Sequence, residues 1–190
     1  MKSDSPTAAH GRALTSTMVY RWPLTLVLGA LAVALAAQFA VPLPLTLVPM
    51  SLQALAVILV GGLIGAAAGT GAMVLYLVAG AFGAPVFAGG AAGLPHLIGP
   101  TGGYLLAFPL AAAVTGRVAR RGNLGRCMLA ALLGMVTIHA GGLAQLTLLG
   151  GSFRAAFVAG TAPFLLVDSL KVVIGGLVLW RGQGAFRPRA

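Results

Sequence analysis

The chain has 190 residues, of which 59% are hydrophobic and only 7% are charged, and its mean hydropathy is +1.00. These values exclude a soluble domain of this length and indicate one compact integral membrane protein. The net charge of +10 could suggest nucleic acid, but the basic residues flank the apolar runs, so membrane topology explains them better. The single cysteine, Cys127, excludes an internal disulfide, and with three histidines and two acidic residues we expect no metal site and no cofactor.

The apolar runs predict an all-α bundle of six transmembrane helices. Residues 1–21 form a polar N-terminal tail, residues 22–182 the membrane domain, and residues 183–190 a basic C-terminal tail. Trp22 begins a retained helix rather than a signal peptide, because the apolar run is long and no cleavage site follows it. The expected helices cover residues 22–41, 51–65, 66–82, 104–118 and 127–149, and a last helix carries Pro163 in its first turn and ends at Trp180.

The basic residues predict the orientation of these six spans. With both termini in the cytoplasm, the inside segments hold ten Lys or Arg residues and the outside segments hold only Arg154. That distribution follows the positive-inside rule and places the protein in the plasma membrane of a prokaryote, with residues 42–50 and 83–103 outside. The ten inside residues are Lys2, Arg12, Arg21, Arg117, Arg120, Arg121, Arg126, Arg181, Arg187 and Arg189.

One acidic residue lies inside an apolar segment. Asp168 is the only acid outside the N-terminal tail, and Lys171 follows three residues later on the same helical face. An ionised side chain near the centre of a membrane helix costs about 2.5–3.5 kcal/mol on insertion scales. The pair therefore predicts a polar ligand site near the outer surface, with Asp168 about 7–8 Å below the helix start. A structural ion pair between helices is the alternative.

The loop at residues 83–103 is rich in glycine and proline, so its backbone can approach a ligand closely. Irregular backbone near membrane depth survives only when it is buried in protein or lines a cavity. The run Gly99-Pro-Thr-Gly-Gly103 lacks the Gly-Lys-Ser/Thr ending of a phosphate-binding loop, so no nucleotide hydrolysis is expected. An intramembrane hydrolase is also disfavoured, because no serine stands beside a plausible base.

Four motifs, in order along the chain, resemble the BioY family. They are Pro42-Leu-Pro-Leu-Thr-Leu-Val-Pro-Met-Ser-Leu-Gln53, Phe87-Ala-Gly-Gly90, Gly99-Pro-Thr-Gly-Gly-Tyr-Leu105 and Asp168-Ser-Leu-Lys171. That family is the biotin-specific S component of energy-coupling factor (ECF) transporters. The resemblance implies a six-helix bundle that captures biotin from outside and releases it to the cytoplasm. It also implies partners: a transmembrane coupling protein and two cytoplasmic ATPases.

Biotin offers two ureido N–H donors, a ureido oxygen and a valerate carboxylate. Asp168 could accept a ureido N–H in a charge-assisted bond, and Lys171 could donate to the ureido oxygen or neutralise the carboxylate. For Tyr104 and Gln53 a structural role is equally compatible with the sequence. The candidate substrate-binding residues are Asp168, Lys171, Tyr104, Thr101, Gly89, Gly90, Phe87 and Gln53.

The first helix carries a ladder of small residues, Ala32, Ala36 and Ala40. Small residues on one face let another helix come close, so this ladder is either a docking surface for the coupling protein or an internal packing face. Among the polar residues, His96 is expected to anchor the outer loop, and His139 to bond between helices. Gln38 and Gln145 are expected to do the same as His139.

Two other functions fit part of the sequence. A stand-alone secondary transporter of biotin or another small carboxylated metabolite could use Asp168 for proton coupling, but the chain shows no pair of inverted repeats. An S component for thiamine or riboflavin is a further alternative, although a cationic vitamin would not favour Lys171 beside the acid.

Overall fold

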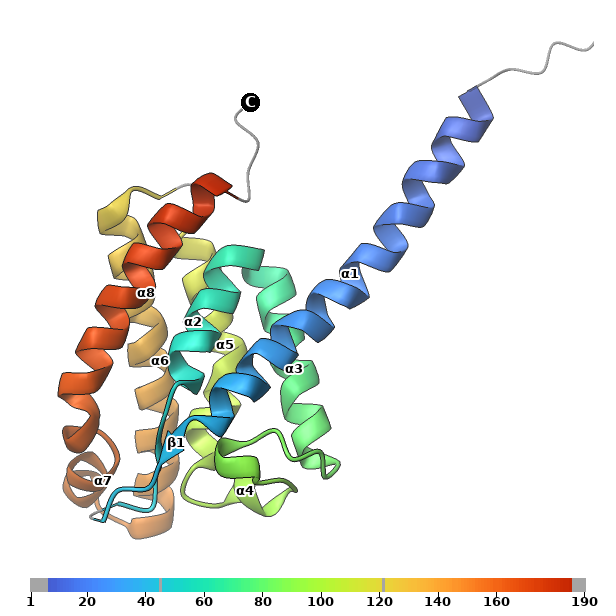
Figure 1. Cartoon of the computed structure of the whole chain (residues 1–190). Helices are drawn as coiled ribbons and strands as arrows, with labels where there is room; N and C mark the ends of the chain where they lie inside the picture. Colours follow the sequence, from blue (N-terminus) through green and yellow to red (C-terminus); the bar gives the residue numbers. More distant parts are fainter. Residues whose placement is uncertain (1–6, 45, 121, 186–190) are drawn as a thin grey trace, which may run out of the picture.

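The computed structural model describes residues 7–44, 46–120 and 122–185, with side chains over 22–182 of these ranges. Six longer helices pack side by side as a bundle, and one of them, α1, crosses its face obliquely and extends beyond it (Figure 1). The longer helices are α1 (Thr7–Gln38), α2 (Gln53–Ile64), α3 (Ala66–Ala81), α5 (Gly102–Val118), α6 (Leu124–Gly150) and α8 (Leu165–Ala185).

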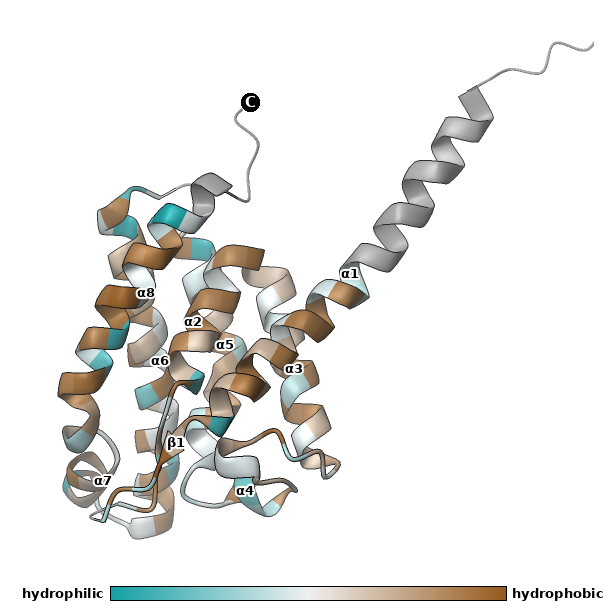
Figure 2. Cartoon of the chain, in the orientation of Figure 1, coloured by the Kyte–Doolittle hydropathy of each residue, from teal (hydrophilic) through white to brown (hydrophobic). Residues whose placement is uncertain are grey.

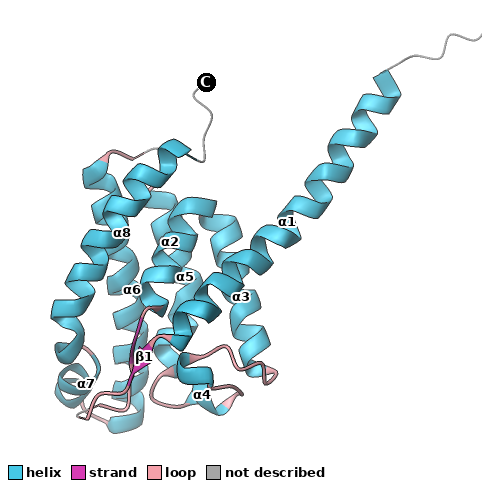
Figure 3. Ribbon diagram, in the orientation of Figure 1, coloured by secondary structure: helices cyan, strands magenta, loops and turns pink. Residues whose placement is uncertain are grey.

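The short elements gather at one end of the bundle, here called the loop end (Figure 3). Strands β1 and β2 form an antiparallel pair in which Ala40 lies opposite Ser51. The short elements are β1 (Ala40–Val41), β2 (Met50–Ser51), η1 (Ala88–Gly90), α4 (Pro95–Ile98), α7 (Phe153–Gly160) and η2 (Ala162–Phe164).

Small residues set the close packing of the helices. A Cβ added to Gly61 of α2 would lie 2.6 Å from the Cα of Ala112 on α5, so these two helices touch through their backbones. The contact between Gly103 of α5 and Gly141 of α6 is equally close, because each would need the space occupied by the other's carbonyl oxygen. This backbone approach brings the helices close enough to pack tightly.

The long helices agree with the sequence prediction in number and order, and differ at their ends. Helix α1 begins at Thr7, not Trp22, and no proline between these two residues interrupts it. It ends at Gln38 rather than Val41, so Ala40 lies in β1 and the expected helical ladder does not reach it. The short pair β1–β2 and the short helices α4 and α7 were also not predicted.

The last apolar segment is divided into α7, η2 and α8, so the last long helix begins after Pro163 and not before it. Helix α7 ends at Gly160, Thr161 leaves helical geometry with φ −130° and ψ −48°, and Pro163 lies in η2. A proline is tolerated at the start of a helix, where its missing N–H has no partner to lose. Helix α8 therefore starts at Leu165 and carries Asp168 in its first turn.

The helices are apolar along most of their length (Figure 2). Large side chains such as Leu166 (84% exposed), Leu35 (66%) and Leu110 (61%) point outward. Among the described residues, two segments are long and apolar enough to cross a membrane, Leu124–Gly150 and Phe153–Gly182, and four shorter helices are apolar as well. Exposed leucines in such numbers indicate a surface covered by lipid rather than by water.

The described arginines divide between the two ends of the bundle. The α5–α6 connection, with exposed Arg117, Arg120 and Arg126, lies at the same end as Arg181 of α8 (Figure 1). Arg154 of α7 lies at the loop end. Lys2, Arg121, Arg187 and Arg189, and the side chains of Arg12 and Arg21, lie outside the described residues.

Candidate ligand-binding site

A cavity of about 240 Å³ extends from the loop end into the bundle, far larger than the space that one water molecule needs. Its walls come from β2 and the start of α2, from the loop between α3 and α5, and from α5, α6 and α8. The lining residues include Ser51, Gln53, Phe87, His96, Thr101, Tyr104, Phe108, Met135, Ile138, His139, Phe164, Asp168 and Lys171.

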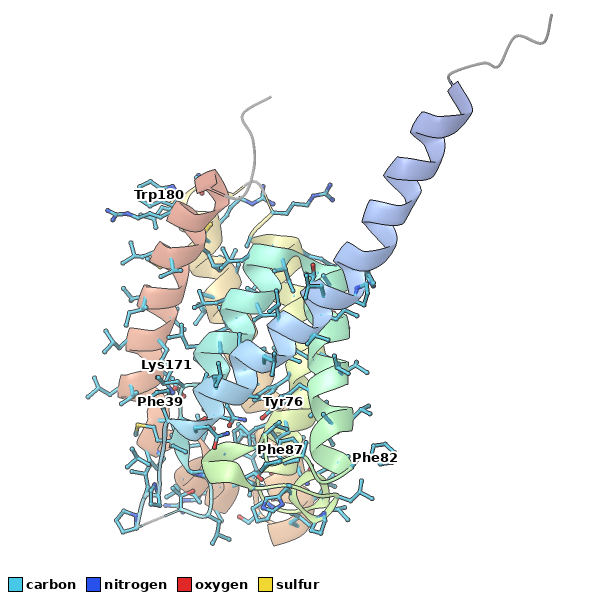
Figure 4. All side chains as sticks on the ribbon, turned by 45° about the vertical axis from the view of Figure 1, so that its right-hand side comes forward. Phe39, Tyr76, Phe82, Phe87, Lys171 and Trp180 are labelled. Atoms are coloured by element: carbon cyan, nitrogen blue, oxygen red, sulfur yellow. The ribbon has the colours of Figure 1, made fainter. Side chains whose placement is uncertain are left out.

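Hydrogen bonds link Asp168, Lys171, His139 and Thr161 into what is here called the charged cluster, and the first three of these residues line the cavity. Asp168 and Lys171 are both buried, and the Lys171 Nζ donates to Asp168 Oδ1 at 2.7 Å. The other carboxylate oxygen, Oδ2, lies 2.8 Å from Nε2 of His139 on α6. The second ring nitrogen, Nδ1, lies 3.2 Å from the Thr161 hydroxyl. Lys171 lies toward the loop end of α8 (Figure 4).

The charged cluster is suited to hold a polar ligand. Its buried acid and lysine compensate each other, which is the condition under which buried charges are tolerated. A carboxylate has about four acceptor positions, so Asp168 retains capacity beyond its two protein partners. Within the described residues no three His, Cys, Asp or Glu side chains lie close enough together to hold a metal ion.

A second set of polar groups, here called the neutral chain, connects the loops around the cavity. The Ser51 hydroxyl donates to Gln53 Oε1 at 3.0 Å, and Gln53 Nε2 donates to the Tyr76 hydroxyl at 2.5 Å. The Tyr76 hydroxyl in turn donates to the Val86 carbonyl at 2.9 Å. The neutral chain joins β2, α2 and α3 to the loop that follows α3, and none of its groups is charged.

Aromatic rings close the cavity between these polar groups. Phe87 is 1% exposed and packs edge-on against Tyr76, with ring centroids 5.6 Å apart. Figure 4 shows these two rings together inside the loop end, whereas Phe82 points away from the bundle. Tyr104 donates its hydroxyl to the Gly160 carbonyl at 2.5 Å, which ties α5 to the end of α7. The walls are therefore largely apolar and tied to several elements of the bundle.

The structure brings together six of the eight residues proposed from the sequence. Asp168, Lys171, Tyr104, Thr101, Phe87 and Gln53 all line the cavity. Gly89 and Gly90 lie beside it in η1 and are not among its lining residues, although the adjacent Ala88 and Ala91 are. The two glycines adopt φ values of +66° and +79°, which L side chains rarely adopt, so the turn itself explains them.

Two residues of the cavity lining, His139 and His96, and Thr161 beside His139 were assigned other roles or none in the sequence prediction. His139 was predicted to bond between helices, which is confirmed, but its partner is Asp168 itself. His96 anchors its loop through Ala92 O at 2.9 Å, as predicted, and also lines the cavity. Thr161 carried no signal in the sequence. For His139 the available signal was a polar side chain within an apolar helix, which marks a functional position by default.

Of the two glutamines predicted to connect helices, Gln145 of α6 does so through Leu97 of α4, and Gln38 does not. Gln38 is exposed and donates to Ala34 O of its own helix, so that prediction is wrong for the contacts found here. Gln145 donates to Leu97 O at 3.1 Å and to Gly99 O at 2.6 Å, so it holds the end of α4 and the loop after it. Gln145 thus fixes a segment that borders the cavity.

An apolar helical bundle that encloses a cavity with a buried, compensated acid and lysine defines a ligand-binding membrane protein. The family model for the BioY family matches residues 10–187, and the chain belongs to this family. The class expected from the sequence, a transport protein rather than an enzyme, agrees with the names of its relatives.

The chain is similar to the probable biotin transporter BioY of Pyrococcus horikoshii, with 38% identity over 72% of this chain and 82% of the relative. It is also similar to the biotin transporter BioY of Rhodobacter capsulatus, with 37% identity over 85% of this chain and 91% of the relative. A crystal structure described as the S component for biotin from an ECF-type ABC transporter has the same fold, with a TM-score of 0.79 and 20% identity. The match covers 88% of this chain and 93% of that one.

Proposed function

We propose that this chain is the substrate-binding membrane component of a biotin uptake system. It captures biotin from outside the cell and releases it to the cytoplasm with ATP-driven ECF partners. The observation that carries the proposal is the pair Asp168–Lys171, buried in the wall of a cavity whose surface is mainly apolar. The names of the relatives, which are biotin transporters, support biotin as the ligand.

The chemistry of biotin matches the walls of the cavity. A carboxylate with free acceptor positions, Asp168, takes a ureido N–H, and Lys171 donates to an oxygen of the ligand. The thiophane ring and the tail methylenes pack against the apolar wall, where Phe87, Phe108 and Phe164 are buried. Tyr104 and Gln53 mainly determine the shape of the site, because their hydrogen bonds connect parts of the protein to each other.

In this proposal the six long helices span the plasma membrane with both termini in the cytoplasm. The described arginines support this orientation, because Arg154 lies at the opposite end of the bundle from Arg117, Arg120, Arg126 and Arg181. Labelling of single cysteines tests it, with Arg120→Cys and Arg154→Cys each placed on a Cys127→Ala background. An impermeant thiol reagent added to intact cells should modify only the second variant, and modification of the first would reverse the orientation.

The coupling protein is proposed to dock on α1. Ala32 is exposed and Ala36 is half-buried one turn further along, so a small-residue face remains open on this helix. Ala32→Trp is expected to abolish biotin uptake in cells that contain the ECF partners while leaving biotin binding by the purified protein unchanged. Unchanged uptake would move the docking surface away from α1.

Equilibrium binding of labelled biotin to the purified, detergent-solubilised chain tests the function itself. Thiamine and riboflavin are the competitors. Asp168→Asn should weaken binding about 100-fold, since hydrogen bonds to charged groups are worth about 1.5–3 kcal/mol each. Ser169→Ala is the matched control, because the neighbouring Ser169 hydroxyl is exposed and donates to Leu165 O of its own helix. Failure of folded wild-type protein to bind biotin would refute the proposal.

Reconstitution into liposomes separates the two transport modes. The chain alone should bind biotin at the membrane without accumulating it, and should accumulate it only with the coupling protein, the ATPases and ATP. Accumulation by the chain alone, driven by a proton gradient, would instead establish a stand-alone secondary transporter.

A further inference from the structure

We infer that His139 is a positioning residue for the ligand-binding carboxylate, and that Thr161 fixes the orientation of its ring. This inference rests on the proposed function, because it assigns how the charged cluster holds Asp168 ready for the ligand. The geometry behind it is a continuous hydrogen-bonded path from Thr161 through both nitrogens of His139 to Asp168.

The carboxylate of Asp168 has one protein partner for each oxygen. Lys171 Nζ holds Oδ1 at 2.7 Å from the same helix, and His139 Nε2 holds Oδ2 at 2.8 Å from a different helix. A lysine three residues away on a flexible stem cannot by itself fix the plane of the carboxylate. The contact from α6 supplies the second point of attachment, so the unused acceptor positions keep one direction.

The ring nitrogens of His139 are both engaged by protein atoms, so the residue acts on a ligand through Asp168. Since a carboxylate only accepts hydrogen bonds, Nε2 must carry the proton in that contact. Nδ1 faces the Thr161 hydroxyl at 3.2 Å, which can donate to a neutral ring or accept from a charged one. This pairing sets which nitrogen points at the acid, as a partner on the distal nitrogen does for metal-bound histidines.

The surroundings leave the imidazole little freedom to turn. The edge of Tyr104 packs against it with ring centroids 6.0 Å apart and an interplanar angle of 82°. Phe164 lies on another side at 6.5 Å. Phe164 follows the break at Thr161, so a single irregular turn supplies the hydroxyl partner and an aromatic neighbour. A residue held on this many sides is suited to fix another group within the small tolerance that a binding site requires.

Three variants on these two residues test the inference. His139→Leu removes the donor to Asp168, and biotin affinity should fall about tenfold or more, the value of one hydrogen bond to a charged group. His139→Gln keeps an amide N–H of similar reach, and affinity should recover to within about threefold of wild type. Thr161→Val should give an intermediate loss, because the ring keeps its contact with the acid but not its orientation.

Thr137→Val is the matched control, since the Thr137 hydroxyl donates to Leu133 O of its own helix and lies away from the cavity lining. It should leave affinity unchanged. Thermal unfolding without ligand accompanies each variant, so that a folding defect is recognised. Wild-type affinity in His139→Leu would overturn the inference. So would a His139→Gln variant as weak as His139→Leu, because a purely structural histidine would not be rescued by the amide.

A measurement without ligand separates this inference from the proposed function. The imidazole nitrogen resonances of His139 in the ligand-free protein should shift in Asp168→Asn and in Thr161→Val, and not in Thr137→Val. Absence of a shift in Asp168→Asn would overturn the coupling between the two residues, whatever the protein binds. If the resonances shift in Asp168→Asn but the wild-type protein does not bind biotin, the proposed ligand is refuted and the coupling between His139 and Asp168 is retained.

Discussion

The charged cluster and the neutral chain hold the same cavity in two different ways. The charged cluster joins α6 to α8; Asp168, Lys171 and Thr161 are buried in it, and His139 is partly buried. The neutral chain joins Gln53 and Tyr76 to a loop carbonyl at Val86, and so fixes segments without regular structure. Under the proposed function this difference corresponds to a division of tasks: helices α6 and α8 present the groups that recognise the ligand, and the neutral chain fixes the loop beside it.

The charged cluster should therefore contribute more to stability and to ligand binding than the neutral chain does. Removing one member of a buried ion pair leaves the other charge uncompensated, whereas removing a neutral partner costs only one hydrogen bond. Variants in the charged cluster should therefore change binding and stability strongly, and variants in the neutral chain should change them moderately. Four substitutions test this ranking, in order of decreasing expected effect.

Lys171→Met should have the largest effect. Within the described residues it leaves Asp168 with His139 as its remaining side-chain partner, and loss of one partner of a buried pair costs about 3–5 kcal/mol of unfolding free energy. Chemical unfolding in mild detergent measures the loss, and labelled biotin should no longer bind. The double variant Asp168→Asn, Lys171→Met should regain much of the stability but not the binding. A double variant as unstable as the single one would contradict the compensation argument.

Gly142→Ala tests the aromatic support of the charged cluster. The Tyr104 ring occupies the space that a Cβ at this position needs, so the ring must move away from His139. Such overpacking costs about 1–3 kcal/mol, and binding should weaken with it. Gly150→Ala at the end of the same helix is the control, because a Cβ there meets nothing within 4 Å. Equal thermal stability of the two variants would show that the ring is not fixed as described.

Tyr76→Phe tests the neutral chain. It removes the hydroxyl that accepts from Gln53 and donates to Val86 O, at a cost of about 1–2 kcal/mol in unfolding free energy. Biotin affinity should fall only about threefold to tenfold. Thr70→Val, which removes a hydroxyl bonded to Pro109 O away from the cavity, should reduce stability without changing affinity. A Tyr76→Phe effect as large as that of Asp168→Asn would erase the proposed distinction between the two regions.

Thr101→Val should have the smallest effect. The Thr101 hydroxyl makes one hydrogen bond of 3.3 Å to His96 O, and a neutral bond of this kind contributes about 0.5–1.5 kcal/mol. Calorimetric titration with biotin should show an affinity within about threefold of wild type. A loss of tenfold or more would instead make Thr101 a ligand contact and move it into the group of recognition residues.

The sequence was sufficient for the helices and for the central pair, because both leave strong local signals. Apolar runs of sufficient length predict the spans, and a carboxylate inside such a run identifies the face that must be turned inward. The position of Lys171 three residues later then follows from helix geometry. The residues proposed from the resemblance to BioY also meet at one cavity, apart from the two glycines of η1.

The features of the fold and site that the sequence did not predict depend on contacts between segments far apart in the chain. His139 and Asp168 are 29 residues apart, and nothing in either local sequence shows that they meet. The break is only partly a matter of local sequence: Pro163 disfavours one continuous helix through this segment, but no local signal places the end of α7 at Gly160. The pairing of β1 with β2 involves only two residues from each strand, too few for any periodic pattern.

The interruption before α8 also has an electrostatic consequence. The start of a helix carries the positive end of its peptide dipoles, which stabilises a nearby negative charge by about 0.3–1 kcal/mol within the first turn. Asp168 occupies that first turn. In an unbroken helix from Phe157 it would lie about three turns from the start, beyond the reach of this field. The irregular turn thus makes the interior of an apolar bundle a more favourable place for an anion.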